Sequence, residues 1–278
     1  MFGVVITFFS TFFDEIGLSI TKAKLNQKQI SIYSIGVINY LAVALFFIVV
    51  NIVEWEFHFS LASLPTLSAR LLIEMILTYI ALKAIAIADR STFGFVRIVT
   101  IPLLLMVDFL LGYKISAWQF AGIGIIIFSL LLIFLFHGIK RQGVWLSLLT
   151  AVMAVATITL YKYDITHYNS VAAEQTIVYL VLLAFLIGMA LVKAKENPFG
   201  FLKQRIYFFQ TLINAIPSFA NSYAYAFAPA SVILSAYRSS AVFWSVVSGK
   251  AYFEERHFLV KLLCLAILIS GIILLVLN

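Results

Sequence analysis

Charge is scarce in this chain of 278 residues. Only 11% of the residues are Asp, Glu, Lys or Arg, whereas 63% are hydrophobic and the mean hydropathy is +1.07. Soluble domains carry about 25% charged and about 45–50% apolar residues, so this chain lacks the polar surface that a water-soluble globule needs. The composition excludes soluble enzymes and nucleic-acid-binding proteins, and it predicts a polytopic membrane protein.

Cysteine and histidine are scarce as well. Cys264 is the single cysteine, which excludes an internal disulfide, a cluster of thiolate ligands and a CxxC redox pair. The four histidines fall in predicted loops or at helix ends without a His-x-x-x-His spacing, so we expect no metal. No glycine-rich nucleotide-binding loop is present, and we expect neither a cofactor nor direct use of ATP.

Ten apolar segments remain when the chain is divided at its polar, proline and glycine positions. Each is about 20 residues long, as a membrane-spanning helix requires, and the loops between them are short. We therefore predict a bundle without an extramembrane domain. The predicted spans are 2–22, 30–52, 64–88, 91–111, 116–136, 143–163, 171–192, 205–228, 230–250 and 258–277.

The sequence aligns with itself when it is shifted by 140 residues, about half its length. A near-constant offset of this kind is the signature of an internal repeat. The predicted fold class is therefore an all-α integral membrane protein of ten transmembrane helices, arranged as two inverted five-helix repeats, residues 1–138 and 139–278. The aligned pairs are Gly3 with Gly143, Thr7 with Ser147, Ser10 with Thr150 and Lys22 with Lys162.

Basic residues support the inversion, because an odd number of spans per repeat turns the second repeat upside down. Of the 19 Lys and Arg residues, 14 lie in or beside the loops joining spans 1–2, 3–4, 5–6, 7–8 and 9–10. Lys and Arg mark the cytoplasmic side, so the net charge of +7 reflects topology. We predict a multi-pass protein of the cell (inner or plasma) membrane with both termini outside the cytoplasm. The 14 residues are Lys22, Lys24, Lys28, Lys83, Arg90, Lys140, Arg141, Lys193, Lys195, Lys203, Arg205, Lys250, Arg256 and Lys261.

The ends of the two repeats carry a further pattern. Near the start of the last span of each repeat, two sets of residues align: Tyr113, Gln119 and Gly122 in the first repeat with Glu255, Lys261 and Cys264 in the second. Together with the ten spans, these residues resemble the EamA-type ten-helix members of the drug/metabolite transporter superfamily. The resemblance covers nearly the whole chain, and it departs from the family's pattern where Cys264 replaces a glycine and where Tyr113 replaces a glutamate.

The first predicted helix resembles the small multidrug resistance proteins, four-helix members of the same superfamily. Asp14, Gly17 and Lys22 keep that family's spacing of a membrane acid, a small residue and a lysine. Its carboxylate binds proton and substrate in turn, so the resemblance implies a proton-coupling role for Asp14. Together the two resemblances imply export or exchange of small organic metabolites, such as an amino acid, or of drugs.

Charged residues inside the hydrocarbon layer cost about 2.5–3.5 kcal/mol each, so each requires an explanation. Asp14 and Glu15 lie near the middle of the first span, where burial favours the protonated carboxyl. A carboxyl poised near neutral pH can exchange a proton for a substrate. Alternatively, the two acids pair with Arg97 or Arg238 and only lock helices together. Adjacent helical positions diverge by about 100°, so the two acids cannot both face one cavity squarely.

Several other residues are candidates for binding a solute. Arg97 and Arg238 occupy roughly equivalent places in the two repeats, where two guanidiniums suit a carboxylate or phosphate. Glu74 is a candidate too, although a local i, i+4 pair with Arg70 explains it better. Glu174 lies close to a helix end, where we expect it to snorkel. A polar and aromatic band, which either lines a cavity or joins helices by hydrogen bonds, adds Asn214, Asn221, Tyr225, Tyr237 and Trp244.

These observations predict a secondary active transporter rather than an enzyme, working as a proton-coupled exporter or exchanger by alternating access. Its expected partners are a small organic solute, protons and membrane lipid, with no nucleic acid, and the expected assembly is a monomer or homodimer. One alternative is a flippase for a lipid or lipid-linked sugar. A less favoured one is a membrane enzyme acting on a lipid-linked substrate, which would need carboxylates or histidines clustered at one membrane face.

Overall fold

The computed structural model describes residues 2–54, 57–110, 116–136, 141–227 and 230–276. Within these ranges the chain is helical and contains no strand, which confirms the predicted all-α class. Short 3-10 or π turns occupy Leu61–Ser63, Ala190–Ala194 and Pro198–Lys203. The α-helices are α1 (Phe2–Asn26), α2 (Ile32–Glu54), α3 (Leu64–Ile87), α4 (Arg90–Arg97), α5 (Thr100–Leu110), α6 (Ala117–Leu135), α7 (Val144–His167), α8 (Val171–Met189), α9 (Arg205–Phe227), α10 (Ala230–Phe253) and α11 (Phe258–Val276).

Among the described residues, four helical segments are long and apolar enough to cross a membrane. Large hydrophobic side chains also point out of the bundle: Val53 is 70% exposed and Leu263 is 67% exposed. Water would disfavour such a surface, whereas lipid accepts it. These two features are those of a membrane protein. The four segments are Ile32–Val53, Arg90–Val107, Val144–His167 and Val171–Ala194, and the shorter apolar helices are Phe120–Ile133 and Phe258–Leu274.

The segment predicted as one helix over 91–111 is instead divided into α4 and α5. Pro102 has no N–H to donate to the carbonyl of Ile98, and its ring crowds that carbonyl. The backbone N–H of Ile101 bonds to the Ile98 carbonyl instead, three residues back, at 2.8 Å. The helix consequently ends at Arg97, beside the cavity described below.

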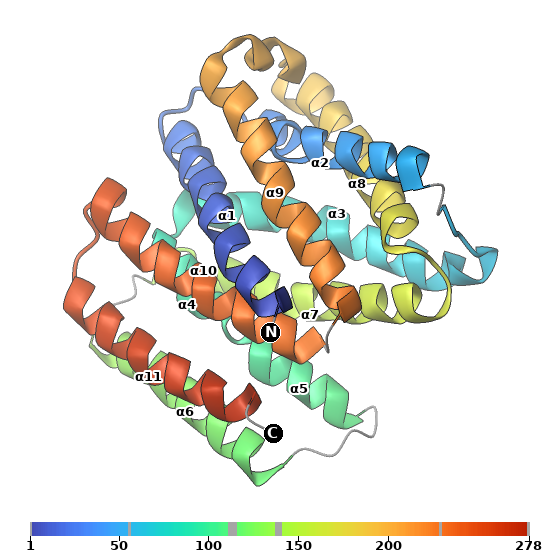
Figure 1. Cartoon of the computed structure of the whole chain (residues 1–278). Helices are drawn as coiled ribbons and strands as arrows, with labels where there is room; N and C mark the ends of the chain where they lie inside the picture. The colour runs from blue at the N-terminus through green and yellow to red at the C-terminus, as the bar shows by residue number, and fades with distance from the viewer. Residues whose placement is uncertain (1, 55–56, 111–115, 137–140, 228–229, 277–278) are drawn as a thin grey trace.

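The helices pack in two groups with α1, α3 and α7 between them (Figure 1). In one group, α6 lies along α11 and α11 packs on α10, around buried residues such as Phe95, Ile126 and Leu268. In the other, α2, α8 and α9 enclose Phe47, Leu186 and other apolar side chains. Polar side chains from several helices meet between the two groups, where α1 packs on α9 and α10 and α3 packs on α7.

Candidate functional site

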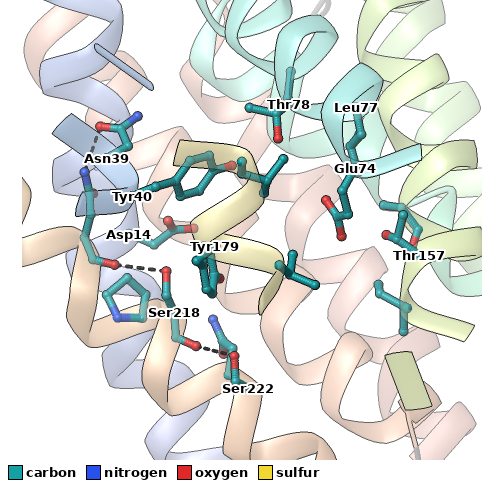
Figure 2. Close-up of a pocket in the computed structure, with 18 of the residues that line it drawn as sticks. Asp14, Asn39, Tyr40, Glu74, Leu77, Thr78, Thr157, Tyr179, Ser218 and Ser222 are labelled. Atoms are coloured by element: carbon teal, nitrogen blue, oxygen red, sulfur yellow. Dashed lines mark hydrogen bonds between the residues drawn. The ribbon is translucent and has the colours of Figure 1, made fainter. Parts of the chain in front are cut away.

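A cavity of about 340 Å³ lies between the two groups of helices. Figure 2 shows its lining, to which residues from α1, α2, α3, α7, α8 and α9 contribute labelled side chains. Its volume lies at the lower end of the range of about 300–1,000 Å³ that is usual for small-molecule sites. The polar lining residues are Asp14, Asn39, Tyr40, Arg70, Glu74, Thr78, Arg97, Thr157, Tyr161, Gln175, Tyr179, Asn214, Ser218, Asn221, Ser222, Tyr237 and Arg238.

Most of the residues selected from the sequence meet in this cavity, although they come from five helices. The structure does not place Glu15 or Trp244 in its lining, and the side chain of Tyr225 lies outside the part that the structure describes. Trp244 packs instead against the rings of Phe12 and Phe243, at centroid distances of 4.8 and 4.9 Å. The residues that line the cavity are Asp14, Glu74, Arg97, Asn214, Asn221, Tyr237 and Arg238.

Asp14 is the acid that α1 presents to the cavity. Its Oδ2 atom accepts a 2.5 Å hydrogen bond from the phenol of Tyr237 on α10. Its neighbour Glu15 points away, as the 100° step between adjacent helical positions requires. The two acids therefore have different surroundings, and Asp14 is the one that a solute in the cavity could reach.

Glu15 belongs to a buried ion pair. Its two carboxylate oxygens accept hydrogen bonds from Arg90 Nε at 3.0 Å and Nη2 at 2.7 Å, and Glu15 is only 6% exposed. Ser248 and Ser19 donate to the same carboxylate at 2.5 and 3.1 Å. The alternative that Glu15 pairs with Arg97 or Arg238 is wrong, because the partner is the arginine that begins α4.

Arg97 is a cavity arginine whose charge is not matched by an ion pair within 4 Å among the described residues. Its Nε atom is buried without a hydrogen-bond partner, and its guanidinium lies over the ring of Phe93, 5.0 Å from the centroid. Arg238 donates from Nε to Thr100 Oγ1 at 3.1 Å and lies over the ring of Tyr237. The cavity thus holds one guanidinium that a bound anionic group could pair with.

The expected local pair between Arg70 and Glu74 is wrong. Arg70 Nη1 forms an ion pair with Glu174 Oε1 at 2.7 Å, and Nη2 donates to Gln175 at 3.2 Å. Glu174 does not snorkel either, because it is 0% exposed. The contact with Arg70 pairs the buried Glu174 carboxylate with a cation. If Arg70 had instead paired with Glu74 along α3, Glu174 would be a buried charge without a cation. Glu74 is left facing the cavity near Thr157 (Figure 2).

Amide side chains from two helices form one wall of the cavity. Asn39 Oδ1 accepts hydrogen bonds from Asn214 Nδ2 and Gln210 Nε2, both at 2.8 Å. Gly17 permits this contact, because a Cβ atom there would lie 1.9 Å from Asn214 Oδ1. Asn39 and its neighbour Tyr40 were not among the residues predicted from the sequence, although an asparagine inside an otherwise apolar span was an available signal.

The end of the bundle beside Glu15 carries a second ion pair. Glu255, in the loop between α10 and α11, bonds to Lys261 Nζ at 2.9 Å and to the backbone N–H of Arg90 at 2.6 Å, and it accepts from Ser91 as well. Burial by itself raises the pKa of the Glu255 carboxyl, but these hydrogen bonds and the Lys261 charge lower it below its ordinary value of 4.5. Glu255 is therefore an anion that fastens the α10–α11 loop to α4.

No group of three or more His, Cys, Asp or Glu side chains in the described part of the chain could hold a metal ion. The arrangement instead offers hydrogen-bonding groups and a few charges around a cavity. Such a site can bind a small polar solute and exchange protons with it.

Comparison with known proteins gives no further guide to function: neither a protein-family model nor a curated protein matches the chain.

Proposed function

We propose that this protein is a secondary active transporter that moves a small organic solute, such as an amino acid or a drug, across the cell membrane in exchange for protons. The observation that carries the proposal is the cavity of about 340 Å³ with Asp14, Glu74 and Arg97 in its lining. Among the described residues none of the three forms an ion pair. Ionisable side chains inside a membrane bundle are costly, and they mark substrate or ion pathways. The resemblance to EamA-type transporters agrees with this function.

Helix packing supports ten spans in two inverted repeats, with α4 and α5 together forming the fourth span. Exchanging the helices of the two repeats should convert each contact into another contact of the bundle. The packing of α1 on α9 corresponds in this way to that of α7 on α3, and α1 on α10 corresponds to α7 on α4. The pairs α2 with α8, α4 with α10 and α6 with α11 each correspond to themselves. A pseudo-two-fold axis of this kind suits alternating access around a fixed site.

Asp14 is the proposed site of proton coupling. It faces the cavity, and the Tyr237 phenol stabilises its ionised form at 2.5 Å. Binding of a cationic or hydrogen-bonding group of the solute would release the proton, and loss of the solute would restore it. Glu15, tied to Arg90, is then a positioning residue that holds α1 against α4.

The proposed orientation of the protein in the membrane follows from the distribution of its Lys and Arg residues. Lys22, the α3–α4 junction and the α10–α11 loop lie together at one end of the bundle, where Lys22 Nζ donates to the Ala88 carbonyl. The positive-inside rule assigns this end to the cytoplasm and both termini to the other side.

The test uses purified protein in liposomes that enclose a pH-sensitive dye. Amino acids, nucleosides, phosphate esters and cationic drugs are added in turn, and a transported solute is recognised by the proton movement that accompanies it. Asp14→Asn should abolish movement driven by a proton gradient, whereas Glu254→Gln, at an exposed position in the α10–α11 loop, should leave it unchanged. Unchanged transport in Asp14→Asn would exclude the coupling role, and absence of solute movement across the whole panel would overturn the proposal.

A further inference from the structure

A separate cluster of buried ionisable groups lies where α7 ends and α8 begins. Asp164 and Glu174 are both 0% exposed. Arg70 pairs with Glu174 Oε1 at 2.7 Å, and Asn169 Nδ2 donates to Glu174 Oε2 at 2.6 Å. Arg70 lies near the start of α3 and the Glu255 ion pair contacts the residues just after its end, so the two clusters occupy opposite ends of the bundle.

The charges of this cluster do not balance. Asp164 and Glu174 lie within hydrogen-bonding reach of each other, and among the described residues the cation in contact with the pair is Arg70. If both carboxyl groups were ionised, a charge of about −1 would remain in a site closed to solvent. Two carboxylates that share a buried site do not both ionise readily, because each disfavours the charge of the other. One proton held between them would restore the balance.

The hydrogen bonds around Asp164 also indicate a proton on this carboxyl group. Thr66 Oγ1 donates to Asp164 Oδ1 at 2.5 Å, whereas the buried Oδ2 atom has no donor among the described residues. Both oxygens of Glu174 already accept, from Arg70 and from Asn169. A proton on Asp164 would supply the missing hydrogen bond, and a carboxylate has about four lone-pair sites, so Glu174 can accept it as well.

A metal cation fits this cluster less well than a proton. Hard cations require about six oxygen ligands that are free to point at the metal. Here the donors Arg70 and Asn169 occupy both oxygens of Glu174, and the backbone N–H of Ser60 occupies Asn169 Oδ1 at 3.0 Å. Asp164 Oδ2 is the carboxylate oxygen of the pair that has no hydrogen-bond partner among the described residues. One such oxygen is enough to hold a proton but too few to coordinate a metal cation.

We infer that Asp164 and Glu174 share a single proton at neutral pH, and that this protonated pair holds α3, α7 and α8 together beside one end of the cavity. The cluster is continuous with two loops that bond to each other: the Ser170 N–H donates to the His58 carbonyl at 2.9 Å. Through Arg70, Asp164, Glu174 and these loops, the pair joins α3, α7 and α8. Losing the proton would leave two carboxylates facing one guanidinium and would loosen this end.

The other titratable groups around the cluster do not donate a hydrogen bond to Asp164 Oδ2 among the described residues. Arg70 and Glu74 come from α3, and the ring of Tyr161 on α7 lies under the Arg70 guanidinium at 4.5 Å. The side chains of His58 and His167 are exposed. The proton shared by Asp164 and Glu174 is separate from the one assigned to Asp14. The proposed function is needed only for the further step that loss of the shared proton loosens this end of the bundle during transport.

The first test is infrared spectroscopy of the full-length protein in detergent at neutral pH. Asp164→Asn should remove the carbonyl band of one protonated carboxyl group. Its amide can donate to Glu174 in place of the proton, so the variant should fold. Glu196→Gln is the matched control, because Glu196 lies in the segment between α8 and α9 and accepts from Ser31 and Ser34 far from the cluster. An unchanged band in Asp164→Asn would overturn the inference.

The second test measures hydrogen–deuterium exchange of peptides covering 57–70 and 160–176. In the wild-type protein, exchange should rise more steeply with pH than in peptides from α2, because the pair loses its proton. Parallel pH dependence in both regions would overturn the inference even if Asp164→Asn failed to fold. Stabilisation of the wild type by Na⁺ without a protonated band would replace the proton by a metal cation. Neither test requires transport, so a protein that moves no solute would overturn the proposed function alone.

Discussion

The Tyr237 phenol lies 2.5 Å from Oδ2 of Asp14 and donates a hydrogen bond to it, which joins α10 to α1 at the wall of the cavity. A phenol is a weaker partner than a cation: it stabilises the carboxylate without neutralising it. Asp14 can therefore gain and lose a proton without breaking an ion pair. Glu15, one residue further on, is held by Arg90 in two hydrogen bonds and lacks this freedom.

Removing the phenol should move the pH dependence of transport. Tyr237→Phe takes a donor away from the Asp14 carboxylate, so the protonated carboxyl persists to higher pH. Hydrogen bonds to charged groups contribute about 1.5–3 kcal/mol, and one pH unit corresponds to about 1.36 kcal/mol. We expect the pH–rate profile to shift by about one to two units towards alkaline pH, measured as initial rates in proteoliposomes. Tyr252→Phe, at a 78% exposed position, is the control. An unshifted profile would separate Tyr237 from proton coupling.

The buried pair of Glu15 and Arg90 should matter mainly for stability. Glu15→Gln leaves the Arg90 guanidinium, which is 1% exposed, without its anion. Removing one partner of a buried pair costs about 3–5 kcal/mol, so the thermal unfolding midpoint in detergent should fall clearly. The double variant Glu15→Met/Arg90→Met should recover part of the loss, since no charge remains buried. A double variant less stable than Glu15→Gln would contradict this reasoning, and Glu254→Gln serves as the exposed control.

The helices could be predicted from the sequence because lipid requires long apolar segments whose backbone hydrogen bonds are satisfied within the helix. The partners of the charged residues could not. Arg70 bonds to Glu174, 104 positions away, instead of Glu74, because the three-dimensional packing of α3 against α8 decides which carboxylate it meets. Glu174 lies close to a helix end along the chain, yet Asn169 in the α7–α8 loop bonds to it, and Ser60 in the α2–α3 loop bonds to Asn169 in turn, so that both loops cover that end.

The cavity itself was partly predictable. Asp14 and Arg97 stood out because charges are rare in apolar spans, and both line the cavity. Tyr40 and Tyr179 line it too, but aromatic residues are common throughout the spans and gave no local signal. The division between α4 and α5 follows from Pro102, whose position inside the fourth span was visible in the sequence.

Glu255 should make stability depend on acid pH. Its pKa in the folded protein lies below the ordinary value of 4.5, so the folded form favours the carboxylate more than the unfolded form does. This contribution to the free energy of unfolding is complete above about pH 4.5 and is lost as the pH falls through the folded-state pKa. Thermal midpoints measured from pH 7 to acid should fall less steeply in Glu255→Gln than in the wild type. Parallel curves for the two proteins would contradict the assigned ion pair.

A glycine in α10 allows this ion pair to form. A Cβ atom at Gly249 would lie 2.7 Å from Cδ and Oε2 of Glu255, and the carboxylate cannot retreat without lengthening its bonds to Lys261 and to the Arg90 N–H. Overpacking of this kind costs about 1–3 kcal/mol, so Gly249→Ala should lower the unfolding midpoint. Gly124→Ala is the matched control, because Gly124 in α6 has no neighbouring atom within 4 Å of the added Cβ. There the better helix propensity of alanine should leave stability unchanged or raise it by up to about 1 kcal/mol. Equal effects of the two substitutions would mean that the Glu255 carboxylate is not confined.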